Sequence, residues 1–178
     1  RVGLWVFLAV VTSLFGLFAV VYNMRAEFSD WRPLPEPGLL WFNTGMLILG
    51  SIVLQRARKD SEKNNLSSLK WSLATGSLLT IVFLFGQLLA WKNLAGLGYF
   101  FSTNPADAFF YVLTGLHGIH LVGGLCFLVL ACIKAWGNID RYNIKEKAQL
   151  NLRIQLCSVY WHYLLLIWLV LFSLLLST

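Results

Sequence analysis

The sequence predicts an all-α protein, a polytopic membrane helical bundle of five transmembrane helices in a single membrane domain over residues 1–178. Hydrophobic residues make up 58% of the chain and charged residues only 12%, and the mean hydropathy is +0.68. These values are typical of membrane proteins and exclude a soluble core. Five apolar runs each reach the ~20 residues that a helix needs to cross a bilayer. We expect spans at about residues 3–24, 38–55, 69–91, 109–132 and 152–176.

The first span, 3–24, begins almost at the start of the sequence. It is too long for the apolar part of a signal peptide and has no small-residue cleavage pattern, so we expect it to be a lasting membrane helix. The segment that follows, 25–37, has prolines at positions 33, 35 and 37. Because proline fixes φ and cannot continue a helix, this link is expected to be extended.

The second and third spans carry small and polar residues inside apolar runs. Asn43 and Thr44 lie near the start of the second span, and Ser72, Gly76 and Thr80 form a stripe with four-residue spacing on the third. Small side chains at this spacing let two helices approach closely in lipid. We therefore interpret both groups as helix-packing residues.

The fourth span, 109–132, has no charged side chain and carries two of the three histidines, His117 and His120. Residues at i and i+3 of a helix share a face, about 60° apart. Glycines flank both histidines and permit close packing, so we expect the imidazoles to face protein near the middle of the bilayer. The fifth span, 152–176, carries the third histidine, His162.

Basic residues are divided unequally between the two sides of this arrangement. Eleven of the fourteen Lys and Arg residues fall on the side of the N-terminus and of the connections after the second and fourth spans. Cytoplasmic loops carry the excess of positive charge, so the N-terminus is predicted to be cytoplasmic and the C-terminus periplasmic or external. This topology also accounts for the net charge of +6, and nucleic-acid binding is not expected.

The three histidines are also the candidate metal or haem ligands, because imidazole binds iron, copper and zinc. A pair at i and i+3 differs in height by only ~4.5 Å, too little to ligate two haems stacked across the membrane. We therefore expect packing groups that donate hydrogen bonds between helices or to lipid, with a single haem or metal site as the alternative. Cys126, Cys132 and Cys157 lack CxxC spacing and are expected to be small buried hydrophobic residues.

Three motifs resemble those of subunit III of the haem-copper terminal oxidases, the cytochrome c oxidase and ubiquinol oxidase family. Residues 110–124, FYVLTGLHGIHLVGG, are similar to the family's helix with a Gly-Phe/Leu-His-Gly-x-His-Val core. Residues 31–44, WRPLPEPGLLWFNT, resemble its Pro-rich entry into a helix with Asn-Thr, and residues 160–172, YWHYLLLIWLVLF, resemble its final helix. The motifs occur in the family's order along essentially the whole chain, and the number of spans matches the short, five-helix form.

The resemblance implies a non-catalytic subunit of a respiratory terminal oxidase in a prokaryotic plasma membrane, acting in aerobic electron transport. The implied partners are catalytic subunit I, the other oxidase subunits and membrane lipids. Haem and copper are implied in the partner subunits, with no cofactor in this chain, because three histidines cannot supply haem ligands and a three-histidine copper site. The chain is expected to stabilise the catalytic subunit and to bind phospholipid.

No catalytic, cofactor or metal residue is expected in this chain. Where the family often has an intramembrane glutamate, the chain has Val10, Val11 and Thr12, and where it often has a late aspartate the chain has Leu165. Proton-related roles of those carboxylates therefore do not carry over. The residues expected to bind lipid or to pack helices are His117, His120, Lys134, Trp161, His162 and Asn43.

Two other functions fit the same residues. A related accessory subunit of a nitric oxide reductase would share the fold and many of the motifs, and the neighbouring catalytic gene would distinguish it. An independent haem-binding membrane electron carrier would instead use the histidines as ligands, and an optical spectrum of the purified chain would reveal it.

Overall fold

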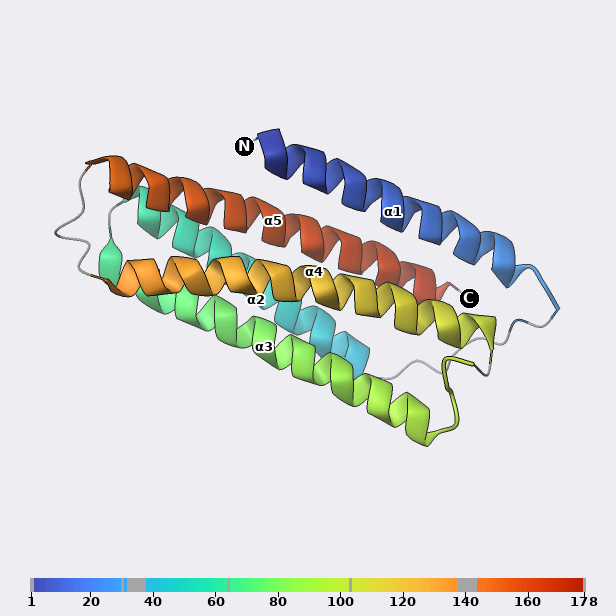
Figure 1. Ribbon diagram of the computed structural model, residues 1–178. Coiled ribbons are helices and arrows are strands. Elements are labelled where there is room, and N and C mark those ends of the chain that lie inside the picture. Colours follow the sequence, from blue (N-terminus) through green and yellow to red (C-terminus); the bar gives the residue numbers. More distant parts are fainter. Residues whose placement is uncertain are drawn as a thin grey trace.

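Five long helices make up nearly all of the described chain. The computed structural model describes residues 2–29, 31, 38–63, 65–102, 104–137 and 144–177 (Figure 1). All five helices are long and apolar enough to cross a membrane, and no strand occurs in these ranges. The predicted all-α fold is therefore confirmed. The link 25–37 was expected to be extended, but residues 25 and 26 still belong to the first helix and residues 27–29 form a turn. Positions 30 and 32–37, which include the three prolines, lie outside the described residues. The helices are α1 (Val2–Ala26), α2 (Leu39–Glu62), α3 (Leu66–Gly96), α4 (Pro105–Trp136) and α5 (Ile144–Leu176).

Most helices extend past the apolar runs, because hydropathy marks only the part of a helix that suits hydrocarbon. Local capping explains two of the helix starts. The side chain of Asn65 accepts a hydrogen bond from the Ser68 N–H (3.3 Å) before α3. The side chain of Asn104 accepts one from the Ala106 N–H (3.2 Å) before α4, whose first residue is a proline. Both are favourable helix starts, since the cap satisfies a free N–H and proline needs none.

Neighbouring helices along the chain run in opposite directions (Figure 1). The N-terminus and the connections α2–α3 and α4–α5 lie toward one end of the bundle. The C-terminus and the connections α1–α2 and α3–α4 lie toward the other. The basic residues of the first group of connections therefore gather at one end, which we call the basic end.

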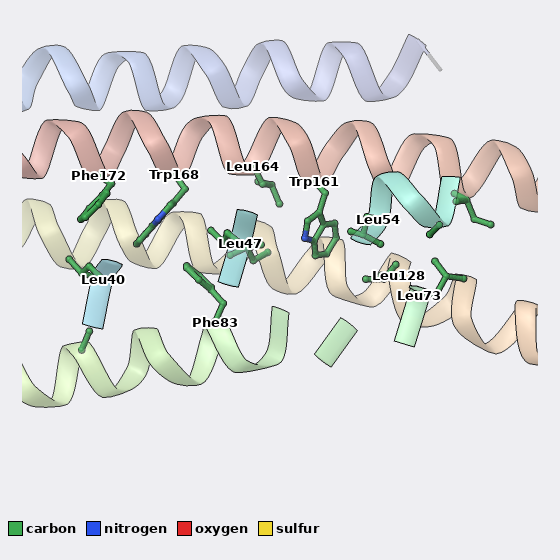
Figure 2. Packing of buried hydrophobic residues seen from close by; sticks show 14 of the residues in the cluster. Leu40, Leu47, Leu54, Leu73, Phe83, Leu128, Trp161, Leu164, Trp168 and Phe172 are labelled. Carbon is green, nitrogen blue, oxygen red and sulfur yellow. The ribbon is translucent and has the colours of Figure 1, made fainter. Parts of the chain in front are cut away.

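The main core lies between α2, α3, α4 and α5, and α1 packs along the outside, mainly on α4 and α5 (Figure 1). Figure 2 shows part of this core, with Trp161, Leu164, Trp168 and Phe172 of α5 pointing toward the other helices. A second, smaller cluster joins α1 to α4 and α5. It consists of Val11, Phe15, Tyr22, Leu113, Ile167 and Leu171.

Glycine lets helices approach closely at Gly76 and at Gly124. A Cβ at Gly76 of α3 would lie 3.0 Å from Cδ2 of Leu54 on α2, and a Cβ at Gly124 of α4 would lie 2.7 Å from Cζ3 of Trp161 on α5. The other members of the α3 stripe, Ser72 and Thr80, are also buried. The predicted packing role of this stripe is therefore confirmed.

Candidate functional site

Trp168 joins four helices in the middle of the bundle. Its indole is fully buried, and its Nε1 donates a hydrogen bond to Oγ1 of Thr44 on α2 (2.9 Å). The ring packs edge-on against Phe83 of α3 (5.1 Å between centroids) and lies against the imidazole of His117 on α4 (5.2 Å). Figure 2 shows Trp168 and Phe83 pointing toward one another from α5 and α3. We call these side chains, together with the adjacent amides described below, the Trp168 layer. Its members are Asn43, Thr44, Phe83, Gln87, His117 and Trp168.

His117 lies wholly inside this layer, with no exposed surface. Phe83 packs against its ring as well (6.0 Å between centroids). Neither Nδ1 nor Nε2 has a hydrogen-bond partner among the residues that the structure describes. The expectation that this imidazole faces protein holds, but the expected hydrogen bond to another helix does not form among these residues.

The other two histidines bond to their own helices. Nδ1 of His120 donates to the Leu116 carbonyl (2.7 Å), and Nδ1 of His162 donates to the Ser158 carbonyl (2.6 Å). His120 is half-buried and His162 is exposed on the outside of the bundle. Both bonds run four residues back along one helix, so Nδ1 of each ring is already used. A bond to another helix or to lipid would come from Nε2, and it stays a prediction.

His117 and His120 also face different neighbours, although they share one side of α4. The His117 ring faces α3 and α5, whereas the His120 ring lies near Phe7 and Phe15 of α1, at 5.9 and 5.8 Å between centroids. Over a step of three residues the helix turns far enough that one histidine faces the bundle interior and the other faces α1. In the described ranges, no group of three or more His, Cys, Asp or Glu side chains could hold a metal ion.

Asn43 of α2 contacts α3 in the same part of the bundle. It is fully buried, its Nδ2 donates to Oε1 of Gln87 (3.4 Å), and its Oδ1 lies where a Cβ of Gly86 would be. Asn43 therefore fits against α3 only because residue 86 is glycine. Asn43 Oδ1 and Gln87 Nε2 have no partner in the part of the chain that the structure describes.

Polar and aromatic contacts fasten α1 to the bundle. The hydroxyls of Thr12 and Tyr163 share a hydrogen bond (2.8 Å), and the Tyr163 hydroxyl donates to the Leu8 carbonyl (3.2 Å). Tyr163 belongs to α5, so these bonds join the first helix to the last. Near the other end of α1, Tyr22 packs edge-on against Trp31 and Phe109.

A groove lies between the start of α1, α2 and α5. It encloses about 300 Å³ and combines apolar walls with one guanidinium group and one amide. The guanidinium, from Arg58, also pairs with Glu62 at 3.2 Å on the exposed surface. We call this cavity the α1 groove, and its lining residues are Leu4, Trp5, Arg58, Gln155, Leu156 and Val159.

The remaining two expected site residues have different surroundings. Trp161 is buried against Gly124, so it packs helices together. Lys134 lies exposed in the last turn of α4, at the basic end. The three cysteines are free, and Cys157 is buried as expected, but Cys126 lies exposed on α4.

Sequence reasoning missed three residues of the interior. Gln87 is a buried amide in the middle of an apolar run, and its position next to a glycine could have indicated a close helix contact. Trp168 belongs to the motif at residues 160–172, but its central position in the interior gave no separate signal, because tryptophans occur throughout this chain. Asp107, in the first turn of α4, lies just before the expected span 109–132. It is fully buried, and its carboxyl oxygens have no partner among the described residues.

Comparison with known proteins agrees with the motifs. A family model described as cytochrome c oxidase subunit III matches residues 33–177. Cytochrome c oxidase subunit 3 of Thermostichus vulcanus is 33% identical over 97% of this chain and 84% of its own length. The protein of the same name from a Synechocystis species is 30% identical, over 97% and 72%.

A quinol-oxidase protein is similar as well. Cytochrome bo(3) ubiquinol oxidase subunit 3 of Buchnera aphidicola is 23% identical over 96% of this chain and 87% of its own length. One residue of each motif, Asn43, His117 and Trp168, is buried in the bundle interior. The resemblance found in the sequence is thus confirmed, and the chain belongs to the cytochrome c oxidase subunit III family.

Proposed function

We propose that this chain is the non-catalytic subunit III of a respiratory haem-copper terminal oxidase. In this role it takes part in aerobic electron transport as one member of a membrane complex that reduces oxygen. The observation that carries the proposal is the family match over residues 33–177, together with relatives named as oxidase subunits. Redox chemistry then belongs to the partner subunits, with haem and copper bound there.

The surroundings of the histidines support a non-catalytic role. A bis-histidine haem needs two imidazoles that face each other across the ring. Here the His117 ring lies against Trp168 and Phe83, the His120 ring lies near α1, and His162 is exposed on α5. Because the three rings face three different environments, they are better suited to packing and to lipid contact than to a shared ligand site.

We propose catalytic subunit I as the main partner, and phospholipid as the bound ligand. The α1 groove supports the second part, since apolar walls suit acyl chains and the Arg58 guanidinium suits a phosphate. Lys134 at the basic end offers a second cation, and basic groups at the cytoplasmic surface attract anionic lipid. Of the six residues expected to bind lipid or to pack helices, Lys134, His120 and His162 are proposed to contact lipid. The other three, His117, Trp161 and Asn43, pack helices together.

We further propose a prokaryotic plasma membrane as the location, with a cytoplasmic N-terminus and a periplasmic or external C-terminus. The three relatives named above are bacterial. The concentration of Lys and Arg at one end of the bundle supports the orientation through the positive-inside tendency. In this arrangement the five spans form one membrane domain, and the basic end lies at the cytoplasmic surface.

Purification of the native complex through a tag on the C-terminus tests the proposal. We expect the tagged chain to bring with it a catalytic subunit with haem and copper, and the complex to consume oxygen. A complex that lacks this chain should keep its initial rate but inactivate faster during turnover. Isolation of a nitric oxide reductase instead would assign the chain to that enzyme. A haem bound to the chain alone would show an independent electron carrier.

A further inference from the structure

Unpaired polar atoms are concentrated in the Trp168 layer. Among the buried side-chain nitrogen and oxygen atoms that lack a partner in the described ranges, four belong to three side chains there: Nδ1 and Nε2 of His117, Oδ1 of Asn43 and Nε2 of Gln87. Buried polar groups in proteins are nearly always hydrogen-bonded, to protein or to ordered water. Their concentration in one layer therefore points to a bound molecule that is not part of the chain.

A series of direct contacts connects the neighbourhoods of the three side chains. Asn43 bonds to Gln87, and the next residue of α2, Thr44, bonds to Trp168. Trp168 in turn contacts His117. Phe83, about one turn before Gln87 on α3, packs on both Trp168 and His117. The unpaired atoms thus come from α2, α3 and α4, on side chains that either contact Trp168 or lie within about one helical turn of a residue that does.

The chemistry of the unpaired atoms is complementary to water. Asn43 Oδ1 accepts a hydrogen bond, Gln87 Nε2 donates one, and a neutral imidazole offers one donor and one acceptor. A cation would suit the carbonyl oxygen but not the amide N–H, whereas water donates and accepts. Buried waters typically make about three hydrogen bonds, which matches three side chains.

We propose that Asn43, Gln87 and His117 form a binding site for an internal water molecule in the Trp168 layer, between α2, α3 and α4. The water connects α4, through His117, to α2 and α3, which the Asn43–Gln87 bond already joins. This role goes beyond membership of an oxidase complex and does not depend on it. The competing arrangement is a rotated His117 ring that bonds to the Leu113 carbonyl, as the other two histidines bond four residues back.

Radiolytic hydroxyl labelling of the intact native complex in heavy-oxygen water tests the site, because radicals formed from a bound water oxidise the side chains that touch it. We expect Trp168, whose ring lies against the His117 imidazole and therefore beside the water, to incorporate heavy oxygen although it is fully buried. His117→Phe and Gln87→Met keep the size of each side chain and remove polar groups, so each should abolish the label on Trp168. Thr80→Val is the matched control for Gln87→Met. Thr80 is also buried on α3, and its hydroxyl bonds to the Gly76 carbonyl (2.9 Å).

An unlabelled Trp168 in the wild-type complex, or a label that persists in both variants, would overturn the proposal. Co-purification with the other subunits shows that each variant assembles. If neither variant assembles, a structure of the wild-type complex at a resolution that shows waters decides. We expect density within hydrogen-bond distance of a His117 nitrogen and of Gln87. A His117 ring bonded to Leu113, with no density beside it, would refute the site.

Discussion

Replacing Gly124 by alanine tests the close packing of α4 on α5. The new Cβ would lie 2.7 Å from Cζ3 of Trp161 and 2.8 Å from Cε1 of Tyr160. Carbon atoms in contact prefer separations of ~3.5–4.0 Å, so the rings or the helices must move apart by about 1 Å. Trp161 is only 1% exposed and cannot move without displacing its neighbours in the core. We therefore expect Gly124→Ala to lower the free energy of unfolding by ~1–3 kcal/mol, the usual cost of overpacking.

The neighbouring glycine provides the control. Gly123→Ala adds the same methyl group to the same helix, where no atom lies within 4 Å of the new Cβ. The assay heats the purified complex in mild detergent and measures how much of this chain stays folded and bound. The expected difference corresponds to roughly 5- to 150-fold in the equilibrium constant.

A second substitution identifies the atoms responsible for the effect. Trp161→Phe removes the Cζ3 atom, so adding it to Gly124→Ala should cost less than the two single effects combined. If Gly124→Ala and Gly123→Ala are retained equally, the close approach of α4 and α5 is wrong.

Three further experiments test the orientation, the lipid site and the attachment of α1. With a cytoplasmic basic end, an impermeant thiol reagent added to intact cells should label Ser29→Cys but not Lys63→Cys; the reverse pattern contradicts the topology. Arg58→Gln should reduce the anionic phospholipid that co-purifies with the complex, whereas Lys92→Gln, at the other end, should not; equal retention argues against the α1 groove. Tyr163→Phe removes the hydroxyl that bonds to α1, at a cost of ~0.6 kcal/mol, and should speed amide hydrogen exchange in α1; unchanged exchange would show that apolar packing alone holds this helix.

The sequence was sufficient to predict the helices, since apolar runs of the required length have few other solutions in lipid. It also identified packing residues such as Gly76 and Trp161. The neighbours of each side chain could not be predicted in the same way. A membrane helix is apolar on every side, so no contrast in hydrophobicity distinguishes the face that meets protein from the face that meets lipid. For this reason His117 and His120 were expected to act alike, although one lies in the core and the other under α1.

Polar interior residues were hardest to predict. Gln87 and Asp107 become important only through burial, and burial depends on how the helices are arranged around them. The position of Asn43 likewise depends on a glycine of another helix, 43 residues further along the chain. Such pairs are properties of tertiary contacts and leave no periodic pattern in the sequence.

The packing of α1 on α4 and α5 has a consequence for biosynthesis. Helix α1 leaves the ribosome first, but its main partners are the last two helices to be made. At a synthesis rate of ~5–20 residues per second, α1 spends on the order of ten seconds in the membrane before α5 can supply Tyr163. During that time its aromatic and polar side chains are available to chaperones and to membrane proteases. Completion of α5 is thus the step that ends this exposure, and chains truncated before α5 should be degraded from the N-terminal helix.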